Sequence, residues 1–319
     1  MWPEGTVPVV SICSLTYNHE KFIRECLDGF LMQETTFPVE ILIHDDASTD
    51  STANIIREYE AQYPRIIKPI YQRENQYSRG ASPGVTFLLP RAKGNYIALC
   101  EGDDYWTDSL KLQKQVDFLD ENPDYVICYH DAKIIDEAGN VVADSKLPEE
   151  CKKDFSSEEL MKGEWALTLS IVFRNVVTEY PEEIYKVLNV DTFLTVILGK
   201  YGKGKYLAEI EPAVYRKQPG SVWSSLHRDD QTFQLFNSLI YIYQYHIRTN
   251  GKEFAIDFLI ERVLPFLQRL FPERNPYSQI WEREKRLRRS YTYRAGELVL
   301  WPFKKVRNLW RAITRFGAK

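Results

Sequence analysis

The chain has 319 residues, of which 44% are hydrophobic and 27% are charged. This composition is typical of a globular protein and excludes a largely disordered chain. No apolar run approaches the roughly 18 residues that a membrane-spanning helix needs, which excludes an integral membrane protein. The first apolar run follows an acid and no basic segment, so we expect no signal peptide.

The net charge of −4 hides an uneven distribution along the chain. Residues 281–319 contain twelve Lys and Arg against three Glu, so this segment carries +9 and the rest of the chain −13. Its apolar residues recur at three- and four-residue spacing, which is typical of a helix lying in a membrane interface. We expect residues 291–319 to be a basic amphipathic tail that binds an anionic membrane surface. The alternative is a terminal helix packed on the acidic body.

The basic segment is not accompanied by a recognised nucleic-acid-binding module, so we expect no nucleic-acid partner. The five cysteines are scattered and include no CxxC pair, which indicates free thiols in a reducing compartment. We therefore expect a cytoplasmic protein that is peripheral on the inner face of the cell membrane. The five histidines show no metal-ligand spacing, and we interpret most of them as ordinary surface or core residues.

The first half of the chain alternates between strand and helix patterns. Strand patterns cover residues 7–13, 39–44, 65–71, 95–100 and 125–129. Helical patterns cover residues 19–33, the region around 55–59, a stretch ending near 92, and residues 109–119. This alternation predicts an α/β fold with a mostly parallel central sheet and helices on both faces.

The second half is less regular. Further strand patterns lie at 133–135, 141–142 and 167–173, with one or two edge strands within 205–216. A helical pattern covers 191–201, and the sequence is entirely helical in pattern from residue 229 onward. We therefore expect a C-terminal helical extension after the α/β part.

Polar and acidic residues follow three of the predicted strands. They are Thr16-Tyr17-Asn18 after the first, Asp45-Asp46 after the second, and Glu101-Gly102-Asp103-Asp104 after the fourth. In open α/β sheets, ligands bind at the carboxyl ends of the strands. Five acids in one place repel one another unless a cation is bound, and oxygen ligands without His or thiolate suit Mg²⁺ or Mn²⁺. The alternative is that Asp serves as a turn former, which explains each position separately.

Glycine-rich phosphate-binding motifs are missing from the sequence. It contains no GxxxxGK[ST], and no GxGxxG follows the first strand. P-loop and dinucleotide-binding functions therefore lack support. If a nucleotide binds, we expect a metal to hold its phosphates and an aromatic ring to stack on its base.

Three segments in order resemble family-2 glycosyltransferases with the A-type, Rossmann-like nucleotide-sugar fold. They are VVSICSLTYNHEKFIRECLDGFLMQ, VEILIHDDASTDST and GNYIALCEGDDYW, within about residues 7–130. A looser similarity begins at Asp191 and continues through KYGKGKYLAEIEPAVYRKQPGSVWS. The resemblance implies inverting, hexosyltransferase-type transfer from a nucleotide-diphosphate donor, with a UDP-sugar expected. The acceptor would be a hydroxyl of a saccharide or lipid-linked molecule in cell-surface polysaccharide synthesis, and the cofactor Mn²⁺ or Mg²⁺.

The resemblance also implies roles for residues of the first two motifs. Thr16, Tyr17 and Asn18 would line the nucleotide pocket, with Tyr17 near the base. Asp46 would accept a hydrogen bond from the base, and Asp45 would support it.

The third motif, Glu101-Gly102-Asp103, occupies the family's acid-x-acid position. Asp103 would bind the metal. Glu101 stands where the family more commonly has Asp, and its carboxylate would reach toward the metal or the ribose. The helix before the fourth predicted strand lacks the Arg and Asn pair that the family often has, and we expect Arg79 to supply the positive charge at the nucleotide sugar instead. Asp191 stands where the family places its catalytic base, although an acid in the first turn of a helix is also favoured by the helix dipole.

The resemblance also implies that Asp104, Arg216 and Trp223 lie on the acceptor side of the site. Gln218 stands where relatives often carry His. We expect residues 1–228 to be the catalytic domain, 229–290 the helical extension and 291–319 the tail. Two alternatives are a nucleotidylyltransferase, which usually carries a glycine-rich basic loop missing here, and a catalytically degenerate carbohydrate-binding or scaffold protein.

Overall fold

The computed structural model describes residue 3 and residues 5–164, 166–218 and 222–270. The chain forms two compact units, residues 1–264 and 265–319, and the structure describes only residues 265–270 of the second. The predicted tail at 291–319 and its membrane contact lie outside the described residues. The boundaries expected at 228 and 290 stay predictions.

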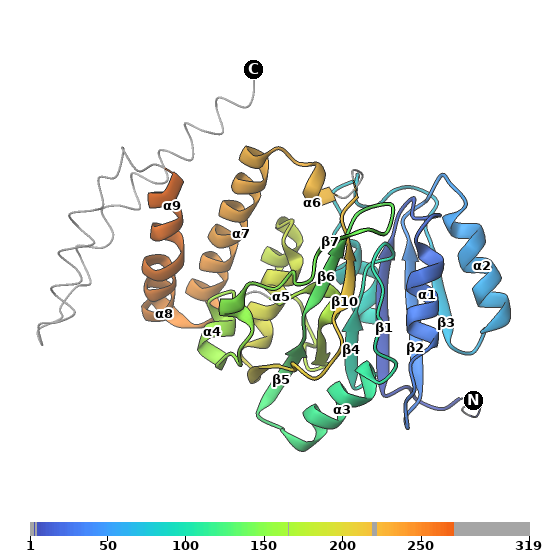
Figure 1. Ribbon diagram of the computed structural model, residues 1–319. Coiled ribbons are helices and arrows are strands. Elements are labelled where there is room, and N and C mark those ends of the chain that lie inside the picture. The colour runs from blue at the N-terminus through green and yellow to red at the C-terminus, as the bar shows by residue number, and fades with distance from the viewer. Residues whose placement is uncertain (1–2, 4, 165, 219–221, 271–319) are drawn as a thin grey trace, which may run out of the picture. The chain divides into compact units, whose positions relative to one another are not determined.

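A seven-stranded sheet in the order β3-β2-β1-β4-β8-β5-β9 forms the centre of the first unit (Figure 1). Its strands are β1 (Val10–Thr16), β2 (Val39–Asp45), β3 (Ile67–Tyr71), β4 (Tyr96–Leu99), β5 (Tyr125–Tyr129), β8 (Val172–Arg174) and β9 (Lys203–Tyr206). β8 runs antiparallel to its neighbours β4 and β5, and the other pairings are parallel. The predicted α/β fold with a mostly parallel sheet is confirmed.

Helices and short helical turns connect these strands. The helices before the C-terminal region are α1 (Ile23–Leu31), α2 (Thr52–Gln62), α3 (Lys111–Glu121), α4 (Ser157–Met161) and α5 (Val190–Leu198). The short turns are η1 (Gly84–Leu88), η2 (Leu89–Arg91), η3 (Glu149–Cys151), η4 (Thr168–Ser170) and η5 (Glu182–Lys186). α1 is amphipathic and buries Ile23, Leu27 and Phe30, whereas α5 buries all of its residues 193–198, which are mostly apolar.

A second sheet of three strands lies beside the first. It has the order β10-β6-β7, from β6 (Ala132–Ile135), β7 (Val141–Ala143) and β10 (Ala213–Arg216). β10 pairs with β6 in parallel, and a bridge between Tyr105 and Val214 joins it to the loop after β4. This sheet therefore brings residues from two distant parts of the chain to the carboxyl end of β4.

The predicted strand at 167–173 is wrong in its first half, which is the 3-10 turn η4. The side chain of Trp106 donates to the carbonyl of Leu169 at 2.7 Å, and that of Gln115 donates to the carbonyl of Ser170 at 2.9 Å. These carbonyls are therefore used by side chains rather than by a strand ladder.

The helix expected over 19–33 begins only at Ile23. The preceding backbone is held by the loop before α2 instead. The amide of His19 donates to Thr52 Oγ1 at 2.8 Å, and that of Glu20 donates to Asp50 Oδ2 at 3.1 Å. This short segment thus ties the first two strand ends together before the helix starts.

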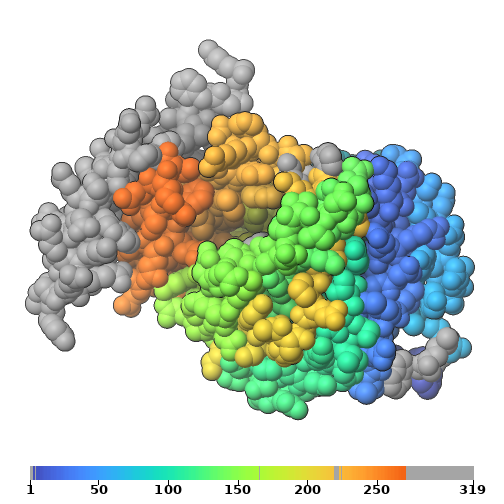
Figure 2. Space-filling model, in the orientation of Figure 1, coloured from blue at the N-terminus to red at the C-terminus, as the bar shows by residue number. Residues whose placement is uncertain are grey.

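The helical pattern predicted from residue 229 is confirmed as far as residue 270. The helices are α6 (Val222–Ser225), α7 (Arg228–Thr249), α8 (Gly251–Phe258), η6 (Leu259–Val263) and α9 (Leu264–Leu270). Figure 2 shows the surface hollowed between the orange helix α7 and the green segments that precede α5. Among the described residues, no helix has the length and apolar character needed to cross a membrane.

His246 fixes α7 to the rest of the unit. Its Nε2 lies 2.9 Å from the carbonyl of Met161, and Asn250 Nδ2 lies 2.8 Å from its Nδ1. The ring also packs against Phe254 and Phe258. This arrangement suits a neutral imidazole that donates from Nε2 and accepts at Nδ1, and burial lowers the pKa of His246 to about 4.

We expect His246 to make the fold less stable in acid. Between its ordinary pKa of 6.5 and about 4, the unfolded state binds a proton that the folded state excludes, so stability falls as the pH falls. Urea denaturation at pH 7 and pH 4.5 should show a loss about 2 kcal/mol larger in the wild type than in His246→Gln. His227→Gln removes an exposed histidine and should keep the wild-type loss; equal losses in all three proteins would contradict this account.

Candidate active site at the strand ends

The carboxyl ends of β1, β2 and β4 meet at one edge of the sheet. The parallel register places Thr16 opposite Asp45, and the amide of Asp46 donates to the carbonyl of Thr16 at 3.0 Å. The amide of Gly102 donates to the carbonyl of Leu15 at 2.8 Å. The structure thus brings the three polar segments predicted from the sequence into direct contact.

The residues at the end of β1 are hydrogen-bonded to the loop before α2, and they leave the ring of Tyr17 exposed. Asn18 has a positive φ of 56°. Its amide donates to Ser48 Oγ at 2.9 Å and its side-chain oxygen accepts from the amide of Thr49 at 2.8 Å. Tyr17 is 43% exposed, so its ring is accessible to a ligand, whereas the hydroxyl of Thr16 is buried and has no hydrogen-bond partner among the described residues.

The two acids at the carboxyl end of β2 differ in their surroundings. Asp46 holds the following loop, because its carboxylate accepts from the amides of Gln76 at 2.7 Å and Tyr77 at 3.0 Å. Asp45 is buried, which raises its pKa, while hydrogen bonds from Ser48 act in the opposite direction. Oδ1 of Asp45 has no partner within the described part of the chain. Asp46 therefore fixes the loop, and Asp45 retains an unused acceptor.

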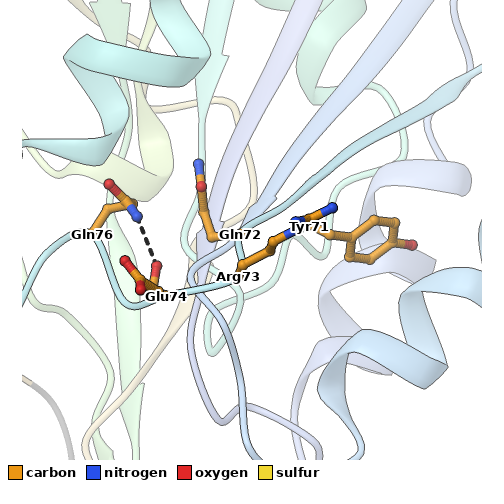
Figure 3. A pocket seen from close by; sticks show the side chains of 5 residues that line it. All are labelled: Tyr71, Gln72, Arg73, Glu74 and Gln76. Carbon is orange, nitrogen blue, oxygen red and sulfur yellow. Dashed lines mark hydrogen bonds between the residues drawn. The ribbon is translucent and has the colours of Figure 1, made fainter.

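The loop that Asp46 holds lines an open cavity of about 430 Å³ at the end of β3. Its lining residues are Tyr71, Gln72, Arg73, Glu74 and Gln76 (Figure 3). Gln76 Nε2 donates to the carbonyl of Glu74 at 2.9 Å, as the dashed line in Figure 3 shows. Arg79 lies on the same loop, is largely exposed and pairs with the carboxylate of Glu74.

Three carboxylates gather after β4. Oxygen atoms of Glu101, Asp103 and Asp104 all lie within 4.8 Å of one another. Asp103 Oδ2 accepts from Gln218 Nε2 at 2.7 Å and lies 4.0 Å from His19 Nε2.

The cluster disfavours full ionisation of its members. Burial, followed by the charges of Asp103, Cys100 and Glu101, raises the pKa of Asp104 well above its usual range. Crowding by protein atoms and the charges of Asp103 and Asp191 also raise the pKa of Glu101, although that residue keeps contact with solvent. A bound cation would relieve this repulsion, and the oxygen-only ligand set fits Mg²⁺ or Mn²⁺.

Arg216 supports the cluster from inside the protein. It is 4% exposed, and its backbone amide donates to Asp104 Oδ1 at 2.8 Å. Its Nε donates to the carbonyl of Asp103 at 3.2 Å, and its guanidinium pairs with Glu25. The structure therefore places this side chain against the loop of the acids. Trp223, also predicted on the acceptor side, is half-buried in α6.

Asp191 lies in the first turn of α5. Its Oδ2 accepts from Thr168 Oγ1 at 3.2 Å, and its Oδ1 accepts from the amide of Thr192 at 2.8 Å. It is close enough to the acidic cluster for its charge to raise the pKa of Glu101. The predicted base and the predicted metal ligands thus belong to one site.

Two residues of this site were missed by sequence reasoning. His19 directly follows the Thr16–Asn18 segment, and this position is the signal in the sequence by which it could have been found. Lys146 lies in the loop after β7, where the charges of Asp104, Asp191 and Glu101 act on it. No local pattern marks Lys146, because only the tertiary fold brings it to the strand ends.

Comparison with known proteins identifies the family. The model of Glycosyl transferase family 2 matches residues 11–170, which is half of the chain. The chain therefore belongs to this family, and the resemblance predicted from the three motifs is confirmed.

Relatives extend this result. An uncharacterised protein of Mycobacterium tuberculosis is 41% identical over 225 residues, which are 70% of this chain and 63% of the relative. The chain thus spans less than two thirds of that relative's length. The Escherichia coli protein named UDP-Glc:alpha-D-GlcNAc-diphosphoundecaprenol beta-1,3-glucosyltransferase is 36% identical over 112 residues, 35% of this chain and 41% of its own.

Solved structures share the fold. TarS of S. aureus, in complex with UDP-GlcNAc, has a TM-score of 0.60 at 20% identity, covering 83% of this chain and 73% of its own. The mannosyltransferase PcManGT of Pyrobaculum calidifontis, in complex with GDP-Man and Mn²⁺, has a TM-score of 0.54 at 17% identity, covering 82% and 73%. These likenesses confirm the predicted A-type fold.

We expect Gly102→Ala to lower the stability of the protein. A Cβ there would lie 2.8 Å from Thr16 Cβ and 3.0 Å from His19 Nδ1, so buried atoms would have to move. Overpacking of this kind costs about 1–3 kcal/mol, measurable by urea denaturation. Gly84→Ala is the matched control, since its Cβ would meet only Leu15 Cδ1 at 3.7 Å. If both variants are as stable as the wild type, the strand ends are packed less tightly than described.

Proposed function

We propose that the chain is an inverting glycosyltransferase that moves a sugar from a nucleotide-diphosphate donor to the hydroxyl of an acceptor. The observation that carries the proposal is the cluster of Glu101, Asp103 and Asp104 at the meeting point of three strand ends, with Asp191 beside it. Such an arrangement offers oxygen ligands for a metal-bound diphosphate and a separate carboxylate for the acceptor.

The nucleotide would bind between the segment after β1 and the loop held by Asp46. The exposed ring of Tyr17 offers a surface for stacking on the base. Asp45 and Asp46 offer carboxylate acceptors for base N–H groups. Oδ1 of Asp45 is buried without a partner among the described residues, and both oxygens of Asp46 accept from loop amides. Arg79 would reach the donor only by exchanging its present partner, Glu74. A UDP-sugar is the expected donor, since the TarS structure contains UDP-GlcNAc and the Escherichia coli relative is named for UDP-Glc.

The divalent metal would be held by Asp103 and Glu101. A bound Mg²⁺ or Mn²⁺ supplies Lewis-acid stabilisation of the negative charge that develops on the diphosphate. Asp103 is oriented for this role by Gln218, whose amide leaves the other carboxylate oxygen of Asp103 available. Mn²⁺ in the PcManGT structure supports the choice of metal.

Asp191 would act as the general base for the acceptor hydroxyl. Its carboxylate would accept the proton of the acceptor hydroxyl while that oxygen forms a bond to the anomeric carbon. The bond from the anomeric carbon to the diphosphate oxygen breaks at the same time, and its electrons leave with the nucleoside diphosphate. Thr168 and the backbone of Thr192 hold the carboxylate for this task.

The acceptor would be a saccharide or a lipid-linked saccharide in polysaccharide synthesis. The Escherichia coli relative is named for a diphosphoundecaprenol-linked acceptor, which supports a lipid-linked molecule. A site on the inner face of the cell membrane is consistent with such an acceptor. The basic segment 291–319 would then attract the protein to anionic lipid.

The direct test is isothermal titration of the full chain with UDP, with and without Mn²⁺. Wild-type protein should bind UDP more tightly with Mn²⁺, and Asp103→Ala should lose that gain, because it removes the metal's main ligand. Asp117→Asn, an exposed acid on α3, is the control and should bind as the wild type does.

A second readout separates binding from catalysis. Asp191→Asn should keep metal-dependent UDP binding and lose UDP release from the donor sugar that the wild type uses. Equal UDP affinity for wild type and Asp103→Ala in both metal conditions would contradict the proposed site. Metal-dependent binding without turnover across a panel of donors would instead favour a carbohydrate-binding or scaffold role.

A further inference from the structure

Lys146 occupies an unusual place in the second sheet. It lies in the loop between β7 and η3, and its amide donates to the carbonyl of Ala132 at 2.7 Å. Its ammonium lies 3.6 Å from the centroid of the Tyr215 ring, over the strand β10. The backbone of Lys146 is thus held by a hydrogen bond, and its ammonium lies on the face of an aromatic ring.

Acidic groups on two separate elements act on this ammonium through their charges. They are Asp104 and Glu101 in the loop after β4, and Asp191 at the start of α5. Lys217, which follows β10, acts on Lys146 as a like charge. Tyr215, whose ring this ammonium contacts, directly precedes Arg216, whose amide donates to Asp104 Oδ1 at 2.8 Å. Lys146 therefore lies near the carboxylates proposed to hold the metal, and the charge of Asp191 also acts on it.

The loop that carries Lys146 is fixed by a single carboxylate, Asp131, just after β5. Asp131 Oδ1 accepts from the amides of Leu147 at 2.9 Å and Lys146 at 3.2 Å, and Oδ2 accepts from Ser145 Oγ at 2.6 Å. Lys152 Nζ lies 3.2 Å from the same carboxylate. Burial raises the pKa of Asp131, but these hydrogen bonds outweigh it and the net shift is downward. The ionised carboxylate thus clamps three consecutive residues.

We propose that Lys146 binds the donor phosphate that carries the sugar, and that Asp131 is a positioning residue for it. The inference rests on the proposed function, because it assigns a contact within the same donor site. By the proposed function, the diphosphate would lie at the carboxylate cluster and the anomeric carbon on the side of Asp191. A cation on which the charges of both act would therefore meet the sugar-bearing end of the diphosphate. An ammonium gains more from an anionic phosphate oxygen than from a neutral sugar hydroxyl. Lys146 thereby stabilises the charge that the leaving diphosphate gathers.

Titration of the full chain with UDP and with UMP, both with Mn²⁺, tests this contact, since UMP lacks the second phosphate. Lys146→Met should weaken UDP binding by about 10- to 100-fold, the range for a hydrogen bond to a charged group, and leave UMP binding unchanged. Lys146→Arg should restore most of the UDP affinity because it keeps the charge. Lys217→Met is the matched control for general electrostatics and should bind both nucleotides as the wild type does.

The role of Asp131 needs a double-mutant cycle. Asp131→Asn should weaken UDP binding in the wild-type background and have little further effect in Lys146→Met, because both changes remove one contact. Ser145→Ala removes one hydrogen bond of the clamp and provides a milder variant if Asp131→Asn folds poorly. Additive losses from Asp131→Asn and Lys146→Met would overturn the positioning role.

The outcomes distinguish this inference from the proposed function. Metal-dependent UDP binding that Lys146→Met leaves intact overturns the inference alone. An equal loss of UDP and UMP affinity in Lys146→Met, or the same loss in Lys217→Met, also overturns it, because the effect would not be specific to the second phosphate. A wild-type protein that binds neither nucleotide overturns both proposals.

Discussion

The site depends on the parallel register of β1 with its neighbours β2 and β4. Backbone pairing sets Thr16 beside Asp45 and Cys13 beside Leu99, so the residues that follow each strand emerge at the same edge. The period of a strand is two residues, and a shift of one would turn these side chains to the opposite face. The chemistry of the site is therefore fixed by main-chain hydrogen bonds within the buried sheet.

Gathering carboxylates at one edge has an electrostatic cost, and the second sheet reduces it. β10 brings Arg216 and Gln218 onto Asp103 and Asp104, although more than a hundred residues separate these groups in the chain. The loop after β7 adds Lys146 from a third region. These groups therefore place hydrogen-bond donors and a positive charge beside the acidic cluster.

Much of the site could be predicted from the sequence because buried strands are short apolar runs whose ends are easily located. The acids after β2 and β4 follow such runs directly, and the sheet edge then implies their proximity. The hydrogen bonds that Asp46 accepts from the amides of Gln76 and Tyr77 could not be predicted, because they depend on the path of a loop. Lys146 was missed for the same reason. The first half of the strand expected at 167–173 is a 3-10 turn instead, where distant side chains, including that of Trp106, bind the backbone carbonyls.

The central claim is that the acids at the strand ends hold a divalent metal for a nucleotide diphosphate. Anomalous diffraction at the manganese edge, from crystals of the protein grown with UDP and Mn²⁺, tests it most directly. The account predicts an anomalous peak at direct coordination distance from a carboxylate oxygen of Asp103, with a UDP phosphate oxygen in the same coordination sphere. Bound UDP with its phosphates away from the acidic cluster and no manganese beside Asp103 would contradict the account.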